Sequence, residues 1–318
     1  NVVTGTVFSW VVQTSSNVTG ANAGTGTSIT DLLTVTDGVS SGSVTYLITP
    51  SAAGCFGSSL AVNVDVNPIP DVSALPQSIC SGTTTSVLII NPNGVANTTF
   101  SWTVLTASNV TGAVSGSGTT ISQLLTATDG VTAGTVTYEI IPTANGCAGT
   151  PITVVVTVDP RPSVTNSATD LFQEICSNQA LNFTPTANIV GTTFTWTSNV
   201  IGSLSGVTAS GSGSITDIPV NNTSTSAAVI YTITPSSGGC LGSPVNFVVT
   251  VRPVPDAFAA DQTICSGQSA SLVISNPNGV SGTTFTWTVS TATNVSGALP
   301  GAGTSISQVL ASLDGVTD

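Results

Sequence analysis

The sequence contains no histidine, no lysine and no methionine among its 318 residues, and its two basic side chains are Arg161 and Arg252. Without histidine there is no imidazole general base and no usual zinc site. Without lysine there is neither a Schiff base nor a Walker-type phosphate contact. We therefore expect a protein that is not an enzyme and that holds no cofactor, with weak calcium binding as the one open exception.

Charge is also scarce, because charged residues make up 5% of the chain and the net charge is −12. A negative surface without Lys/Arg clusters repels phosphate backbones and anionic lipid, so nucleic acid and acidic membrane surfaces are excluded as partners. No apolar run reaches the roughly 18 residues of a membrane helix, and threonines interrupt runs such as residues 152–158. We expect no membrane insertion in this segment and no signal peptide at Asn1.

What the sequence does contain is an internal repeat, most visible at its four tryptophans, which are 92, 94 and 91 residues apart. Each tryptophan follows Phe-Ser or Phe-Thr and precedes an Asn-Val pair and glycine-rich residues. A Tyr-x-Ile strand, a Gly-Cys pair and a proline-rich joint follow in the first three copies. The tryptophans, all predicted to be core residues, are Trp10, Trp102, Trp196 and Trp287.

Aligning the copies divides the chain into repeat 1 (residues 1–66), repeat 2 (67–159), repeat 3 (160–252) and repeat 4 (253–318). In this alignment repeat 1 lacks its opening strands and repeat 4 lacks its closing strands. Two interpretations follow. The sequence is a window on a longer repetitive chain, or subunits complete each other head to tail by strand donation.

Within a repeat, apolar residues alternate with period two, as in Phe100, Trp102 and Val104, which is the pattern of a half-buried strand. Asn-Gly, Asp-Gly and Pro residues separate the strands, and no helical stripe is present. About seven strands per repeat with a core tryptophan predict an all-β, immunoglobulin-like sandwich. Stiff joints such as residues 67–70 and 159–162 favour an extended rod of such sandwiches.

Several phrases together resemble a known module. Examples are Ile79-Cys80-Ser81-Gly82, Thr99-Phe100-Ser101-Trp102 and Asn145-Gly146-Cys147. They are similar to the PKD-like, immunoglobulin-like tandem modules of very large bacterial surface adhesins, including those of gliding bacteria with type IX secretion. The Gly-Asp-Gly turn of true PKD domains is absent after the tryptophan. The resemblance implies secretion, display at the cell surface and adhesion or spacing.

Six cysteines at recurrent positions indicate an oxidising, extracellular compartment. Because modules of the resembled kind often hold both cysteines in one unit, the resemblance favours pairs within repeats. These pairs are Cys80–Cys147 and Cys176–Cys240, with Cys55 and Cys265 bonded to partners outside this sequence. The alternative pairs, across each joint, are Cys55–Cys80, Cys147–Cys176 and Cys240–Cys265.

Acidic residues supply the remaining site candidates. Asp-Gly pairs at Asp37, Asp129 and Asp314 are predicted to be turns, although each offers one carboxylate to calcium. Asp65, Asn67 and Asp71 at the first joint form a weak calcium candidate. Arg161 and Arg252 at the later joints argue against a repeated calcium clip.

Together these observations predict a non-catalytic structural or adhesive stalk segment of a giant cell-surface adhesin, outside the cell. Its expected partners are neighbouring repeats of the same chain and possible partners at the cell surface, such as surface polysaccharide. One alternative is a self-assembling extracellular filament subunit completed head to tail by strand donation. Another is a carbohydrate-binding module array attached to an unseen enzyme.

Overall fold

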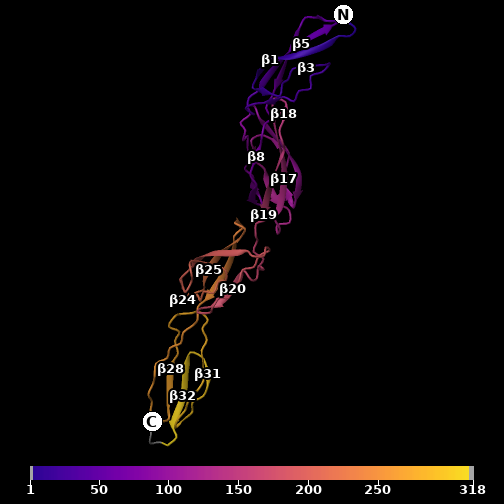
Figure 1. The fold of residues 1–318 in the computed structure, drawn as a ribbon. Helices are drawn as coiled ribbons and strands as arrows, with labels where there is room; N and C mark the ends of the chain where they lie inside the picture. The colour runs from indigo at the N-terminus through magenta and orange to yellow at the C-terminus, as the bar shows by residue number, and fades with distance from the viewer. Residues whose placement is uncertain (1–2, 315–318) are drawn as a thin grey trace. The chain divides into compact units, whose positions relative to one another are not determined.

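The computed structural model describes residues 3–314, and every regular element in this range is a β-strand (Figure 1). The prediction of an all-β protein is therefore confirmed. Within the described residues there is consequently no helix that could cross a membrane. The chain forms two compact units, residues 1–161 and 162–318, and each is described by itself.

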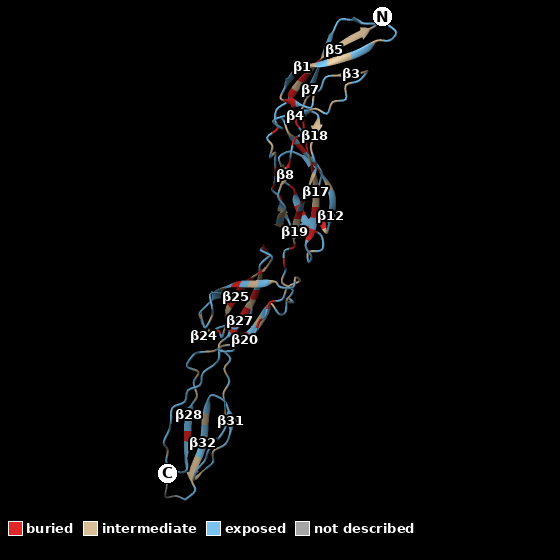
Figure 2. Ribbon diagram, viewed as in Figure 1, coloured by how far each residue is buried: buried red, intermediate tan, exposed pale blue. Residues whose placement is uncertain are grey.

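The strands form where the sequence alternates. In β17 (Gly134–Ala144), Val136, Tyr138 and Ile140 are fully buried, while Thr137 and Glu139 between them lie nearer to solvent. Since successive side chains of a strand point to opposite faces, this alternation gives each sheet one apolar face. Figure 2 shows the same distribution as buried residues gathered along β17, β25 and β27.

The first sheet of repeat 2 has the strand order β14-β12-β17-β19-β9, with β18 paired to β17. All pairs are antiparallel except β9–β19, where Gln77 lies opposite Val156 and Cys80 opposite Asp159. The new bounds are β9 (Gln77–Cys80), β12 (Thr99–Ser108), β14 (Gly116–Ser117), β18 (Cys147–Ala148) and β19 (Ile152–Asp159).

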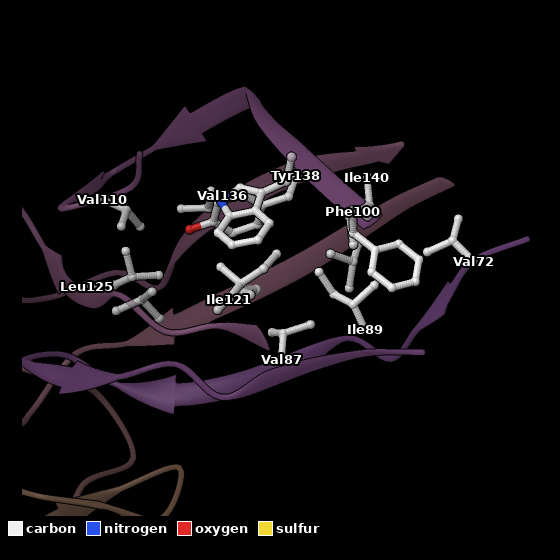
Figure 3. Close-up of a cluster of buried hydrophobic side chains, with 14 of the residues drawn as sticks. Val72, Val87, Ile89, Phe100, Val110, Ile121, Leu125, Val136, Tyr138 and Ile140 are labelled. Carbon is white, nitrogen blue, oxygen red and sulfur yellow. The ribbon is translucent and has the colours of Figure 1, made fainter. Parts of the chain in front are cut away.

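The second layer of repeat 2 consists of short strands in the orders β10-β16-β13 and β15-β11-β8. Side chains from both layers meet in one core, part of which Figure 3 shows. The second-layer bounds are β8 (Ser73–Ala74), β10 (Thr83–Thr84), β11 (Val87–Ile90), β13 (Val110–Thr111), β15 (Thr120–Ile121) and β16 (Leu124–Ala127).

Repeat 3 has the same main sheet in the order β20-β27-β25-β21-β23, with β26 paired to β25 and with β20–β27 again parallel. Its second layer contains the β22–β24 pair and a bridge between Phe183 and Ile215. The bounds are β20 (Phe172–Cys176), β21 (Thr193–Ile201), β22 (Leu204–Ser205), β23 (Ser210–Ser212), β24 (Val220–Asn221), β25 (Ala227–Ser237), β26 (Cys240–Leu241) and β27 (Val245–Arg252).

Repeat 1 contains mainly the first sheet, β3-β1-β5-β6 with β7 on β5, and a short β2–β4 pair. Its buried core residues are Val18, Val44 and Tyr46. The bounds are β1 (Val7–Ser16), β2 (Val18–Thr19), β3 (Gly24–Thr25), β4 (Thr34–Val35), β5 (Gly42–Ala52), β6 (Cys55–Phe56) and β7 (Leu60–Val66).

Repeat 4 contains mainly the second layer, in the order β28-β32-β30, beside a β29–β31 pair. Gly315, predicted to complete the third Asp-Gly turn, lies outside the described residues. The bounds are β28 (Gln268–Val273), β29 (Thr286–Trp287), β30 (Val295–Ser296), β31 (Gly301–Ala302) and β32 (Ser305–Ser312).

The predicted core tryptophans differ between repeats. Trp102 and Trp196 are buried in the cores of repeats 2 and 3. Trp10 is half-buried against the small core of repeat 1, and Trp287 is half-buried in repeat 4. The difference arises because repeats 1 and 4 each present mainly one of the two layers that enclose the tryptophan in repeats 2 and 3.

Candidate functional site

The Asp-Gly turns are capped by their own carboxylates. Asp129 Oδ1 accepts the backbone N–H groups of Val131 and Thr132, both at 2.9 Å, and Oδ2 accepts the Thr132 hydroxyl. The Thr132 hydroxyl, followed by these backbone groups, holds the pKa of Asp129 below its ordinary value of 3.8. Asp37 caps the equivalent turn of repeat 1 through Val39 and Ser40. These hydrogen bonds give both carboxylates a structural role as turn caps.

We expect acid to weaken this turn. A carboxyl whose folded-state pKa is depressed stabilises the fold fully above its unfolded pKa, and that stability is lost as the pH falls through the folded pKa. The free energy of unfolding of repeat 2 should therefore decrease below about pH 4. Asp129→Asn should flatten part of this decrease in urea titrations at a series of pH values.

A second variant distinguishes the Thr132–Asp129 hydrogen bond from the protonation of other carboxyl groups at low pH. Thr132→Ala removes the hydroxyl donor but keeps the carboxylate, so the pKa of Asp129, followed by carbon-13 NMR, should rise. An unchanged Asp129 titration in Thr132→Ala would show that the hydroxyl does not hold the carboxylate.

Each tyrosine strand carries a buried hydroxyl group that ties the two layers together. The Tyr138 hydroxyl donates to Gln123 Oε1 at 2.7 Å, and the same oxygen accepts the Val114 N–H at 3.0 Å. Burial raises the pKa of Tyr138 to about 12, so it remains a neutral donor. The corresponding pairs are Tyr46–Asp31 at 2.6 Å and Tyr231–Asp217 at 2.7 Å.

The proline-rich joint of repeat 2 is held by one asparagine. Asn93 Nδ2 donates to the Ile69 carbonyl at 2.9 Å, and its Oδ1 accepts the Asp71 N–H at 3.1 Å. Asn188 Oδ1 accepts the Ser163 N–H at 2.8 Å in repeat 3. Each of these two joints is therefore hydrogen-bonded to the repeat that follows it and is not a flexible linker.

The fixed joint lies in what we call the joint groove, formed by the Phe of the tryptophan strand and the hairpin that carries the Gly-Cys pair. In repeat 2 the groove residues are Phe100, Pro142 and Gly149, and Pro70 and Val72 are buried there. A Cβ atom on Gly149 would lie 1.9 Å from the Pro70 carbonyl oxygen. Figure 3 shows the Phe100 ring beside Val72. The same close approach occurs in repeat 3, where a Cβ added to Gly242 would lie 1.8 Å from the Pro162 carbonyl oxygen.

The joint groove of repeat 1 is open. It has a volume of about 690 Å³ and is lined by residues that include Phe8, Pro50, Cys55, Phe56 and Gly57. Phe8 is 38% exposed whereas its counterpart Phe100 is 5% exposed. Val3 is 56% exposed whereas its counterpart Val95 is 2% exposed. Among the described residues, this groove is therefore an apolar surface whose counterparts in repeats 2 and 3 are covered.

The calcium candidates at the first joint have other partners. Asp65 Oδ1 accepts a hydrogen bond from the Asn63 side chain at 2.8 Å, and Asn67 bridges Ser41 and the Asn145 carbonyl. Asp71 Oδ1 accepts the N–H of Val72 at 2.8 Å. In residues 3–314 no group of three or more His, Cys, Asp or Glu is placed to hold a metal ion. A calcium site at this joint stays a prediction.

The predicted cysteine pairs are wrong. Cys55, Cys147, Cys176 and Cys265 are free thiols, so neither the pairs within repeats nor the alternative pairs across joints are formed. Cys80 and Cys240 are disulfide-bonded. Bonding of Cys55 and Cys265 to partners outside this sequence stays a prediction.

Strand geometry explains why the pairs within repeats fail. Cys80 lies level with Asp159, beyond the Gly134 end of β17, whereas Cys147 pairs with Ala144 at the other end of that strand. Ten residues of strand separate these levels, which is about 30 Å. A disulfide needs Cα atoms within about 7 Å. Cys176 and Cys240 are separated in the same way along β25.

Sequence reasoning did not identify the joint groove or the asparagine that fixes each joint. The signal was present, because Asn91-Pro92-Asn93-Gly94 recurs as Asn276-Pro277-Asn278-Gly279. Such a phrase is typical of a turn, so its second asparagine carried no separate prediction. Only the structure shows that this side chain reaches back 24 residues to the joint.

The fold and the joints define the class: a chain of tandem β-sandwich modules connected by short proline-containing joints. The chain belongs to the PKD-like domain family, whose model matches residues 1–70, 77–162, 173–255 and 262–318. The fold class and the tandem repeats predicted from the sequence are thereby confirmed. The exact repeat boundaries stay a prediction.

No curated protein matches this chain. A three-domain immunoglobulin fragment of titin is 9% identical, covers 76% of this chain and 87% of its own length, and has a TM-score of 0.36. The human desmocollin-1 ectodomain is 11% identical, with coverages of 95% and 66% and a TM-score of 0.25. Sidekick-1 immunoglobulin domains 1–5 are 12% identical, with coverages of 85% and 60% and a TM-score of 0.30.

Proposed function

We propose that this chain is a non-catalytic spacer segment of a cell-surface protein, located outside the cell, in which the sandwiches form an extended rod. Modules of this class are typically structural. The observation that carries the proposal is that Asn93 and Asn188 fix joints to the following repeats, through Asp71 and Ser163. A joint held in this way transmits orientation from one module to the next, as a spacer requires.

Two further features support this role. Stability in a repeat array is close to a sum of module and neighbour terms, so modules can be added without redesigning a core. The net charge of −12 keeps such a chain soluble and discourages compaction. Adhesion to surface polysaccharide, type IX secretion and a part in gliding belong to the proposal as the surroundings in which such a spacer works.

Small-angle X-ray scattering of the whole chain tests the rod. A sandwich whose longest strands have 11 residues is about 37 Å long, so four modules in line span about 150 Å. The expected radius of gyration is then roughly 40 Å, against about 20 Å for a compact protein of this length. A value near 20 Å would overturn the proposal.

The variant Asn93→Ala tests the joint itself. It removes both hydrogen bonds to the joint of repeat 2, so we expect a lower maximum dimension and a broader distance distribution. Asn63→Ala, which removes a surface hydrogen bond to Asp65, is the matched control and should scatter like the parent chain.

A further inference from the structure

Three Asn-Gly pairs occur in the chain, and one of them differs from the other two in its surroundings. The pairs are Asn93-Gly94, Asn145-Gly146 and Asn278-Gly279. Asparagine followed by glycine readily loses its side-chain ammonia, because glycine has no side chain to keep its backbone nitrogen away from the asparagine amide. The structure decides which of the three pairs can react.

Two of the pairs have both reacting groups engaged in hydrogen bonds. The Asn93 amide is bonded through its oxygen at 3.1 Å and through its nitrogen at 2.9 Å. The Gly94 N–H donates to the Asn91 carbonyl at 3.3 Å. Asn278 and Gly279 make the corresponding three hydrogen bonds in repeat 4. Neither pair can react until these bonds open.

The third pair has both reacting groups free. Asn145 and Gly146 are exposed and form the two-residue turn between β17 and β18, where Ala144 pairs with Cys147. Within residues 3–314, neither the Asn145 side chain nor the Gly146 N–H makes a hydrogen bond. The attacking nitrogen and the amide carbon that it attacks are therefore both available in the folded protein.

The turn itself does not require an asparagine. The corresponding turns of repeats 1 and 3 are Ala53-Gly54 and Gly238-Gly239, and all three turns have positive φ angles at both residues. Of these three turns, that of repeat 2 alone carries a side-chain amide. The amide at Asn145 is thus an addition to a turn that forms without it.

This turn also contacts the joint that precedes repeat 2. Asn67 Nδ2 donates to the Asn145 carbonyl at 3.1 Å, and Asn67 Oδ1 accepts the Ser41 hydroxyl of repeat 1 at 2.8 Å. Asn67 therefore links repeat 1 to the turn of repeat 2. A covalent change at Asn145 would act directly on this link.

We propose that Asn145-Gly146 is a self-modification site, at which Asn145 is converted to isoaspartate and aspartate, and that this conversion alters the contact with Asn67. The Gly146 nitrogen loses its proton and bonds to Asn145 Cγ, and Nδ2 leaves with that proton as ammonia. Water then opens the five-membered ring at either carbonyl. Opening at the former main-chain carbonyl leaves the chain running through Cγ, one atom longer, with a carboxylate at the position to which Asn67 donates.

The test incubates the whole chain at mildly alkaline pH in oxygen-18 water and reads pepsin peptides by mass spectrometry. We expect the Asn145 peptide to gain the deamidation mass together with one oxygen-18 atom. The Asn93 and Asn278 peptides should react about tenfold more slowly, because their hydrogen bonds must open first. In urea, which removes this protection, the three peptides should react at similar rates. Equal rates in the folded chain, or an Asn145 peptide that stays intact, would overturn the proposal.

Three variants provide the controls. Asn145→Gly reproduces the turn of repeat 3 and should abolish the product. Asn63→Ala, at another exposed asparagine, should leave the rate at Asn145 unchanged. Asn67→Ala removes the contact but keeps the Asn-Gly pair, so Asn145 should still react.

NMR of the nitrogen-15-labelled chain tests the effect on the joint. The side-chain amide signals of Asn67 are assigned by their absence in Asn67→Ala. They should move as the Asn145 product accumulates and stay in place during the same incubation of Asn145→Gly. Signals that stay in place in the parent chain while Asn145 is converted would overturn the proposed effect on Asn67.

Discussion

Trp102→Ala should lower the free energy of unfolding of repeat 2 by about 3–5 kcal/mol. Trp102 is 7% exposed and packs in the core of repeat 2, and its Nε1 donates to the Val114 carbonyl at 3.2 Å. Its ring also fills the space left by Gly116, where a Cβ would lie 2.7 Å from the indole. Truncation removes this packing from both layers at once, and the resulting cavity cannot close without moving a strand.

Hydrogen exchange read by mass spectrometry is the appropriate measurement, because it reports on each repeat by itself, whereas a single melting curve of a multi-module chain combines all repeats. Amides of β17 should lose protection in Trp102→Ala, and amides of β25 in the other unit should not. Trp10→Ala in repeat 1 is the matched control, with a smaller expected loss because Trp10 is only half-buried. Equal protection of β17 in the variant and the parent chain would contradict the packing described for Trp102.

Gly149→Ala should destabilise repeat 2 by about 1–3 kcal/mol and loosen its joint. The added Cβ would lie 1.9 Å from the Pro70 carbonyl oxygen and 2.8 Å from Pro142 Cγ. The carbonyl has little room to move, because Asn93 holds the backbone on both sides of it. Relief therefore requires the joint to leave the groove, which should expose Val72 and speed exchange of the Asp71 and Val72 amides.

The same substitution in repeat 1 provides the control. Gly57 is the counterpart of Gly149, but a Cβ there meets only Pro50, with the nearest atom at 2.9 Å. Gly57→Ala should thus change the stability of repeat 1 by less than the loss at Gly149. If both substitutions cost the same, the Pro70 carbonyl does not restrict Gly149.

The fold was predictable because the same pattern of alternating strands and turns occurs four times in the sequence. Residues that alternate with period two around Trp102 and Tyr138 became β12 and β17, and turns formed at Asp37 and Asp129 as the Asp-Gly pairs indicated. The core followed from the pattern in part, since the predicted Trp102 and Trp196 are buried whereas Trp10 and Trp287 are half-buried. Strands and turns depend mainly on residues that are close in sequence, so short stretches of the sequence were enough to predict them.

The cysteine pairing was not predictable, because it depends on which end of a sandwich each strand reaches. Spacing shows that Cys80 and Cys147 belong to one repeat, but not that β9 runs parallel to β19 and ends at the level of Asp159. The joint groove was missed for a related reason. It joins Asn93, Gly149 and Pro70, which are far apart in sequence and individually typical of turns.

The parallel pairing of the first and last long strands also has a mechanical consequence. In repeat 2 the chain arrives at the start of β9 and leaves from the end of β19, so tension on the chain pulls these adjacent strands in opposite directions along their length. The register from Gln77–Val156 to Cys80–Asp159 is then loaded in shear, with all its hydrogen bonds strained together instead of one after another. The five-residue pairing of β20 with β27 places repeat 3 under the same kind of load. Each complete module thus carries a clamp against stretching within its own sheet.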